Sequence, residues 1–538
     1  GTQWTDTGTD KTVTMPAGFG DAYRQFVENG WHGLDGNPEF GGQGLPRVVS
    51  AAVREMWKSA NMAFSLCPLL TNGAIEALEL CGTPEQKQRY LPNMIAGKWT
   101  GTMNLTEPQA GSDLAAIRSR AEPQPDGSYK IFGQKIFITY GEHDMAENIV
   151  HLVLARVTGA PEGVKGISLF VVPKFMVGDA GSLGARNDVQ CVSIEHKLGI
   201  KASPTAVLQF GDQGGAVGYL VGEENRGLEY MFIMMNAARY AVGVQGVAVA
   251  ERAYQLAAAY AKERVQGRPV DGSLPGAGPI IRHPDVKRML LTMRALVEGC
   301  RATAITAAAA YDSAHAHPDA AVRKQSQALY EFLVPLFKGF ATEMSLEVTS
   351  LGVQVHGGMG FVEETGAAQH YRDAKILTIY EGTTAIQAND FVGRKTARDG
   401  GAVARAVADE IEATEGELRQ CGSADALAFA TRLGAARRAF LDVVDFVVAN
   451  NRTDPHAVYA GSVPYLMLAG NLVAGWQLGR ALRVATRLRA GGEDVEFMRR
   501  KIAVARFYAD HLLTRVPGLR DSIVDGGGAV NALEPKAF

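Results

Sequence analysis

The sequence predicts a mainly helical protein of the α+β class, with a central antiparallel β-domain between helical domains. The first observation is the length of 538 residues, several times the usual domain size of about 100–200 residues. The second is the spacing of apolar residues, which recur every three or four positions over most of the chain. The third is a middle region of short β-rich runs, in which apolar residues alternate with polar ones.

We expect four domains, with boundaries where the spacing of apolar residues changes. Residues 1–102 form an N-terminal helical domain, residues 103–222 the β-domain, residues 223–400 a helix bundle, and residues 401–538 an appended helical domain. The β-domain is indicated by runs such as YKIFGQKIFITYG and KGISLFVVPK. Because the chain begins with Gly1 and has no initial methionine, the N-terminal domain is expected to lack native residues.

Composition and charge exclude several classes of protein. With 46% hydrophobic and 21% charged residues the chain is typical of a globular protein, and its net charge of -3 gives no electrostatic footprint for nucleic acid or an acidic membrane surface. Its longest apolar stretch, residues 241–261, contains Gln245, Glu251 and Arg252 and cannot supply the roughly 20 apolar residues of a membrane span. Five scattered cysteines without a CxxC pair indicate buried thiols in a reducing compartment. We expect a protein of a reducing compartment that binds small molecules or other proteins.

The string TEPQAGSD at residues 106–113 is the strongest binding motif. Pro108 restricts a turn, Gly111 allows a ligand close to the backbone, and the hydroxyls of Thr106 and Ser112 can bind polar edges or phosphate. For any three-letter piece taken alone, a turn or a helix cap is favoured over a binding function by about ten to one. The joined string is expected by chance in roughly one chain in a million, so a functional interpretation is favoured.

A second motif, RDAKILTIYEGTTAIQ, occupies residues 372–387 and contains Glu381 between an apolar run and Gly382. A carboxylate in such a place can be desolvated, which raises its pKa toward that of a general base. Taken alone, Glu381 is better explained as a carboxylate at a helix start, interacting with backbone amides.

Together the two strings resemble the acyl-CoA dehydrogenase family. The resemblance spans residues 30–395 and includes, in the family order, GWHGLDGNPEFGGQGLP, GTPEQKQRYLPNMIAGKW and HKLGIKASPTAVLQF. It implies a flavoprotein enzyme with FAD held between the β-domain and the helix bundle, and with Glu381 as the catalytic base. Two departures are a truncated set of first helices and the extension of residues 401–538.

The resemblance also implies the residues that bind the cofactor. Phe137, Ile138 and Thr139 stand where many relatives have Trp-Ile-Thr, and Arg264 matches an arginine that reaches the FAD pyrophosphate across a dimer interface. The other implied FAD contacts, at the flavin edge or in a glycine-containing turn, are Met103, Leu105, Thr106, Gly111, Ser112, Gln266, Gln354, Gly357, Gly358 and Thr383.

For the CoA substrate, the resemblance implies Arg239, Ser112 and Gly382, together with Asn236 in place of the aspartate that relatives often carry. Some relatives place their base immediately before this arginine, but Ala238 occupies that position here. Glu381 would remove the α-proton while the β-hydrogen leaves as hydride to the flavin, and its backbone amide would polarise the thioester carbonyl. No metal is expected, because His196, His356 and His370 fit no metal-binding template and are about five times better explained by packing.

Within the family, the C-terminal extension, the VQGRP string and residues 152–174 resemble a bacterial subgroup, the 3-methylmercaptopropionyl-CoA dehydrogenases. The implied reaction is oxidation of 3-(methylthio)propanoyl-CoA to 3-(methylthio)acryloyl-CoA by a homodimer, with an electron-transferring flavoprotein as acceptor. The alternatives are a medium- or long-chain dehydrogenase of fatty-acid β-oxidation and an acyl-CoA oxidase. A flavin monooxygenase or a non-enzymatic flavin- or CoA-binding protein fits the intact motifs less well. Acyl-chain preference depends on pocket depth, which the spacing of residues does not measure.

Overall fold

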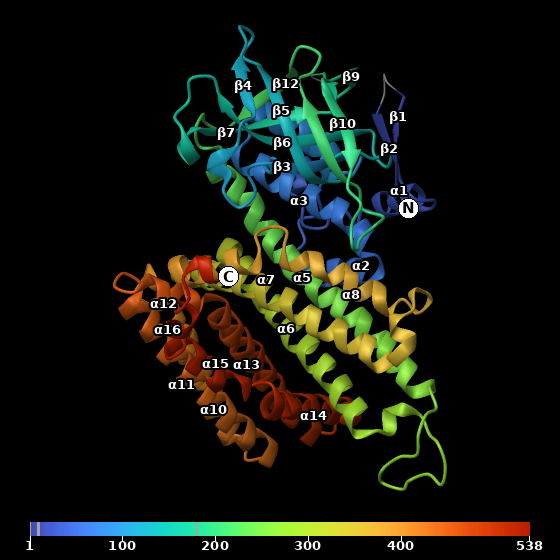
Figure 1. Ribbon diagram of the computed structural model, residues 1–538, viewed down its shortest axis with the longest axis vertical. Helices are drawn as coiled ribbons and strands as arrows, with labels where there is room; N and C mark the ends of the chain where they lie inside the picture. The colour runs from blue at the N-terminus through green and yellow to red at the C-terminus, as the bar shows by residue number, and fades with distance from the viewer. Residues whose placement is uncertain (1, 8–10, 179–180) are drawn as a thin grey trace. The chain divides into compact units, whose positions relative to one another are not determined.

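The computed structural model describes residues 2–7, 11–178 and 181–538 (Figure 1). The chain divides into two compact units, of which the first comprises Gly1–Ser50 and Asn61–Ala241 and the second Ala51–Ala60 and Val242–Phe538. The division falls within helices α2 (Arg47–Ala60) and α5 (Gly227–Glu263). Among the described residues, no helix is both long and apolar enough to cross a bilayer.

The helical part of the first unit contains α1 (Phe19–Glu28), α3 (Met62–Cys81) and α4 (Pro84–Ile95). Helix α3 begins where the Asn61 side chain accepts a hydrogen bond from the Phe64 amide, and it is buried along most of its length. Helix α4 begins with a capping box, in which Thr83 and Gln86 each accept from the other's backbone amide. The predicted N-terminal helical domain is therefore confirmed.

Eight strands of the described chain form the main sheet, in the order β10-β11-β5-β12-β7-β6-β3, with β4 paired to β5 and β6. Their bounds are β3 (Trp99–Asn104), β4 (Arg120–Pro123), β5 (Tyr129–Thr139), β6 (Asn148–Val157), β7 (Ile167–Pro173), β10 (Val189–Ile194), β11 (Thr205–Phe210) and β12 (Ala216–Val221). The central β-domain is confirmed, but the sheet is not purely antiparallel. Strand β6 runs parallel to β3 and β4, because the chain crosses over between them instead of turning back in a hairpin.

Two smaller strand pairs accompany the sheet. They are β1 (Gln3–Asp6) with β2 (Lys11–Thr14), and β8 (Phe175–Val177) with β9 (Leu183–Arg186). The first pair was not predicted from the sequence. It joins the β-domain, since the Trp4 indole donates to the Cys191 carbonyl at 3.0 Å and Val13 packs in the core of the sheet.

The second unit is helical. Its helices are α6 (Pro284–Ala316), α7 (Ala320–His356), α8 (Ala367–Lys375), α9 (Thr384–Val392), α10 (Ala402–Gln420), α11 (Ala424–Asn450), α12 (Pro455–Ala460), α13 (Ser462–Ala490), α14 (Val495–His511), α15 (Arg515–Val524) and α16 (Gly527–Val530). Helix α13 of the extension packs on α6 and α7 (Figure 1). Glycines allow the close approach, since Gly299 of α6 lies against Ala474 of α13 and Gly470 of α13 lies against Phe340 of α7. The predicted bundle and appended helices therefore share one core.

Candidate active site

The segment of TEPQAGSD forms a tight turn directly after β3. The Glu107 amide donates to the Ala110 carbonyl at 2.9 Å, and the Ala110 amide donates back to the Glu107 carbonyl at 3.0 Å. Thr106 is half-buried, whereas Gly111 and Ser112 are exposed. No atom lies within 4 Å of the place that a Cβ on Gly111 would take, so this side of the turn is open.

Phe137 projects from a β-bulge in β5. The register between β5 and β11 shifts between Ala206 and Leu208, so that strand β5 carries an extra residue opposite Val207. Phe137 takes a left-handed φ of 59° and its side chain is 59% exposed, although it is a large apolar residue. Such strain in a bulky residue persists only where the surroundings enforce it, and it is common at ligand sites.

The bulge holds the turn and the aromatic residue side by side. The amide of Ile136, next to Phe137, donates to the Thr106 carbonyl at 2.9 Å. The structure thus brings together two segments, residues 103–112 and 137–139, that were predicted separately from the sequence. Met103 and Ile138 are buried in the first unit, and Leu105 and Thr139 are half-buried.

A buried ion pair between Lys135 and Glu107, not predicted from the sequence, stabilises the turn of residues 106–113. The Lys135 ammonium donates to Glu107 Oε1 at 2.8 Å and to the Leu105 carbonyl at 3.0 Å. Burial by itself raises the pKa of Glu107, but the charge of Lys135 and hydrogen bonds from Arg118 and Ser119 outweigh it and lower that pKa to about 2. Burial lowers the pKa of Lys135 to about 8 against the opposing effect of Glu107. The sequence signal for this pair is a lysine at an inward position of an alternating strand.

Glu381 lies in the second unit, in the loop before α9. Its φ is 56° and that of Gly382 is 86°, so two successive residues have left-handed backbones. The N-cap of α9 is Thr383, whose hydroxyl accepts from the Ile386 amide at 3.3 Å. Thr383, two residues after Glu381, is therefore the side chain that caps the start of α9.

Hydrogen bonds from three helices hold the loop around Glu381. The Tyr380 hydroxyl donates to the Gln245 side chain of α5, and Thr384 donates to Glu343 of α7 at 2.5 Å. From α9, Gln387 donates to the Glu381 carbonyl at 3.0 Å. Burial raises the pKa of Tyr380 well above its usual value, and the nearby Glu381 carboxylate raises it further, so the Tyr380 side chain is neutral.

The remaining FAD candidates of the second unit lie on exposed backbone. Arg264 and Gln266 follow α5, where the His283 ring contacts the Gln266 carbonyl at 2.8 Å. Within the described chain, the Arg264 guanidinium makes no hydrogen bond or ion pair. Gln354 is exposed near the end of α7, Gly357 ends that helix with a φ of 61°, and the positions around Gly357 and Gly358 are open.

The substrate candidates Asn236 and Arg239 lie on α5 in the first unit. Asn236 is exposed, whereas Arg239 is only 3% exposed. Ala238, at the position where a base was considered, is also buried. Among the histidines, His356 stacks on Tyr260 at 4.4 Å, as expected for a packing role.

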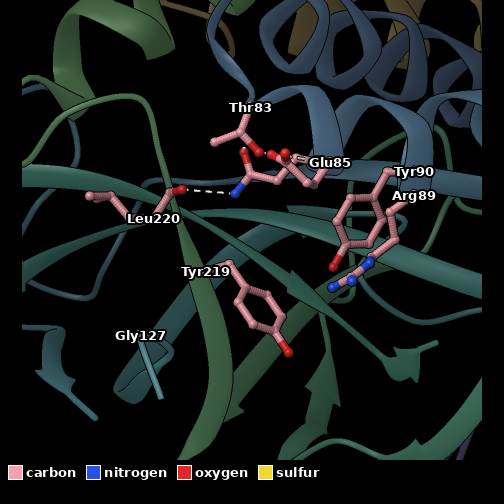
Figure 2. Close-up of a pocket in the computed structure, with 8 residues that line it drawn as sticks. Thr83, Glu85, Arg89, Tyr90, Gly127, Tyr219 and Leu220 are labelled. Atoms are coloured by element: carbon pink, nitrogen blue, oxygen red, sulfur yellow. Dashed lines mark hydrogen bonds between the residues drawn. The ribbon is translucent and has the colours of Figure 1, made fainter. Parts of the chain in front are cut away.

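A pocket with a volume of about 240 Å³ lies in the first unit, beside the start of α4 and strand β12 (Figure 2). Its lining includes Thr83, Tyr90 and Tyr219. Along one side, the side-chain amide of Gln86 donates to the Leu220 carbonyl at 2.8 Å. The pocket contains no predicted site residue, so we assign it no part in the chemistry.

Comparison with known proteins accounts for nearly the whole chain. Family models match in the expected order: the acyl-CoA dehydrogenase N-terminal domain over residues 7–98, the middle domain over 102–213 and the C-terminal domain over 225–395. A further model, described as acetyl-CoA dehydrogenase C-terminal like, matches residues 406–534.

The chain belongs to the acyl-CoA dehydrogenase family. It is 58% identical to the 3-methylmercaptopropionyl-CoA dehydrogenase of Ruegeria pomeroyi, over 96% of this chain and 87% of that protein. It is 37% identical to the broad-specificity linear acyl-CoA dehydrogenase FadE5 of Mycobacterium tuberculosis, over 98% and 88% respectively. A crystal structure of an acyl-CoA dehydrogenase from Bacillus anthracis, complexed with FAD, matches with a TM-score of 0.77 at 24% identity, over 96% of this chain and 85% of that one.

Membership confirms the predicted fold class and the predicted class of enzyme, an oxidoreductase of the acyl-CoA dehydrogenase type. It also confirms FAD as the cofactor, since the family is FAD-dependent. The domain boundaries at 102, 222 and 400 and the roles of the individual site residues stay predictions.

Proposed function

We propose that this acyl-CoA dehydrogenase oxidises 3-(methylthio)propanoyl-CoA to 3-(methylthio)acryloyl-CoA. The observation that carries the substrate is the 58% identity to the Ruegeria pomeroyi enzyme over 96% of the chain. The 37% identity to a broad-specificity linear acyl-CoA dehydrogenase supports a second candidate, a dehydrogenase of straight-chain acyl-CoA thioesters.

The proposed FAD contacts have the chemistry that this dinucleotide needs. The exposed ring of Phe137 and the open turn at Gly111 suit a flat ring system, and the Arg264 guanidinium suits the pyrophosphate, to which it can bind through two parallel hydrogen bonds. The open backbone at Gly357 and Gly358 offers amides for close approach. When bound, FAD supplies the hydride acceptor.

Glu381 is the proposed general base for the α-proton. Its left-handed backbone and the donors that hold the loop restrict the direction in which its side chain leaves the backbone, and general-base catalysis requires a carboxylate in a defined direction. The amide of Glu381 polarises the thioester carbonyl, and this stabilises the enolate-like charge that develops as the proton leaves. Arg239, with Ser112, Gly382 and Asn236, is the proposed contact set for the CoA ester, and Thr383 is a further cofactor contact.

We further propose that the working form is a homodimer in the bacterial cytoplasm that passes electrons to an electron-transferring flavoprotein. Arg264 is exposed and its guanidinium makes no hydrogen bond within the described chain, which supports a role toward a neighbouring subunit. Residues 401–538 are proposed to cover the face through which shorter relatives form tetramers. The packing of α13 on α6 and α7 supports this assignment.

The test is anaerobic reduction of the bound flavin, followed by absorbance, with a panel of 3-(methylthio)propanoyl-, butanoyl-, octanoyl- and palmitoyl-CoA. We expect the methylthio thioester to give the highest ratio of limiting rate to half-saturation concentration. A higher ratio for a straight-chain thioester would support the second candidate instead. Rapid peroxide formation under air would identify an oxidase, and a flavin that no thioester reduces would contradict both candidates.

A further inference from the structure

The backbone carbonyls of Glu381 and Gly382 both accept hydrogen bonds from buried side chains. The Lys338 ammonium of α7 donates to the Gly382 carbonyl at 2.6 Å. The Gln387 side-chain amide of α9 donates to the Glu381 carbonyl at 3.0 Å and to the Gly382 carbonyl at 3.2 Å. Because both residues have left-handed backbones, their carbonyls point out of the helical path and need such partners.

Lys338 and Gln387 are unusual residues for their positions. Both are completely buried, and Lys338 stands in the apolar run FLVPLFKGFA. Lysine is almost never fully buried unless its charge is compensated, and a buried donor is costly if it lacks an acceptor. Here the lysine donates to the backbone carbonyl beside the proposed base, so its ammonium has an acceptor inside the core.

The left-handed conformation of Glu381 has an energetic cost that the surroundings must compensate. Glu381 would relax toward an ordinary backbone conformation if the hydrogen bonds to its own carbonyl and to the Gly382 carbonyl were lost. Relaxation would redirect its carboxylate, and a displacement of about 1 Å in a catalytic group can lower a rate about 100-fold.

We propose that Lys338 and Gln387 are positioning residues that hold Glu381 in its left-handed conformation and so aim its carboxylate at the substrate α-carbon. The proposal rests on the proposed function of Glu381 as the base. It assigns to these two side chains a role in the chemical step and none in binding CoA.

The test uses the FAD-loaded protein with Lys338→Met and, separately, Gln387→Met, since methionine is as long as glutamine and one atom shorter than lysine, and it removes the donor in each case. Thr349→Val is the matched control, because Thr349 is buried in α7 and its hydroxyl donates to the Ser345 carbonyl at 2.7 Å. Anaerobic stopped-flow reduction is measured with ordinary and α-deuterated thioester over a range of concentrations.

We expect each methionine variant to lower the limiting rate of flavin reduction about 10- to 100-fold, with the half-saturation concentration within about threefold of wild type. The deuterium isotope effect should increase, because removal of the α-proton becomes more rate-limiting. The control should stay within about threefold of wild type in both quantities.

The proposal is overturned if folded, FAD-loaded variants reduce their flavin within threefold of the wild-type rate, or if only half-saturation changes. Failure of both variants to fold and bind FAD also overturns it, since the two side chains would then serve the fold rather than the base. A wild type that no thioester reduces contradicts the proposed function, a result distinct from the others.

Discussion

Backbone strain marks the two side chains that matter most for the proposed chemistry. Phe137 and Glu381, both singled out from the sequence, are among the few non-glycine residues of the described chain with left-handed φ values. The fold alone does not require a side chain at either position, because glycine would adopt the same left-handed backbone at a lower conformational cost. We infer that each position retains its side chain because the ring and the carboxylate are needed there.

The first prediction concerns Glu381→Gln, which keeps the shape of the side chain and removes the proton acceptor. The variant should bind FAD and acyl-CoA like wild type, whereas the rate of anaerobic flavin reduction should fall about 100- to 10,000-fold. Ala238 offers no substitute base. Single-turnover flavin absorbance is the measurement, and a rate within about threefold of wild type would show that another group removes the proton.

The second prediction concerns Glu107→Gln, which leaves the buried ammonium of Lys135 without its counter-charge. Urea unfolding followed by circular dichroism at pH 7 should show a loss of about 3 kcal/mol, because one member of a buried ion pair remains alone. Glu122→Gln is the control, since Glu122 pairs with Arg120 on the surface, and it should stay within about 0.5 kcal/mol of wild type.

The same variant has a defined dependence on pH. The pKa of Glu107 is about 2 in the folded protein, below its ordinary value of 4.5, so its ionised form stabilises the fold fully above pH 4.5. This contribution is lost as the pH falls from 4.5 toward 2. At pH 3.5 the difference between wild type and Glu107→Gln should therefore be smaller by about 1.4 kcal/mol than at pH 7. An equal difference at both pH values would argue against the lowered pKa.

At the scale of elements, glycines determine how closely α13 approaches the bundle. A Cβ on Gly470 would lie 2.2 Å from the Phe340 ring, so Gly470→Ala should lower the melting temperature through a clash worth about 1–3 kcal/mol. Gly416→Ala in α10 is the matched control, because no atom lies within 4 Å of its Cβ position. Alanine favours the helix by about 1 kcal/mol, so the control should raise the melting temperature. Thermal denaturation compares them, and an unchanged midpoint for Gly470→Ala would contradict the close packing.

At the scale of the whole molecule, the proposal for Arg264 predicts complementation between subunits. Arg264→Ala alone should bind FAD about 10- to 100-fold more weakly, because charge-assisted hydrogen bonds to the pyrophosphate are lost, whereas Arg268→Ala in the same exposed loop should bind FAD normally. Mixed dimers of Arg264→Ala with Glu381→Gln should regain activity, since one of the two sites then has both an intact base and the partner's arginine.

Purified mixed dimers, separated by two affinity tags, are assayed for flavin content and turnover. An arginine that serves its own subunit would give no recovery, and an active FAD-loaded monomer in light scattering would contradict the dimer. A tetramer would contradict only the role assigned to residues 401–538.

The fold and the composition of the candidate site could be predicted from the sequence because both depend on local signals. Residues 106–113 and Glu381 stand in continuous strings, and the alternation in residues 129–139 predicts a strand without knowledge of its neighbours. The parallel pairing of β3 with β6 was missed, because strand direction depends on which distant segment the chain meets after a crossover.

The sequence by itself therefore determined the class of fold, the family and the residues on which the proposed chemistry rests. Only the tertiary structure decided what holds those residues in place. Lys135 stands at an inward position of an alternating strand and Lys338 in an apolar run, and two of their partners, Glu107 and the Gly382 carbonyl, lie 28 and 44 residues away along the chain. A buried charge is stabilised by whichever groups surround it in space, and no local pattern records that environment.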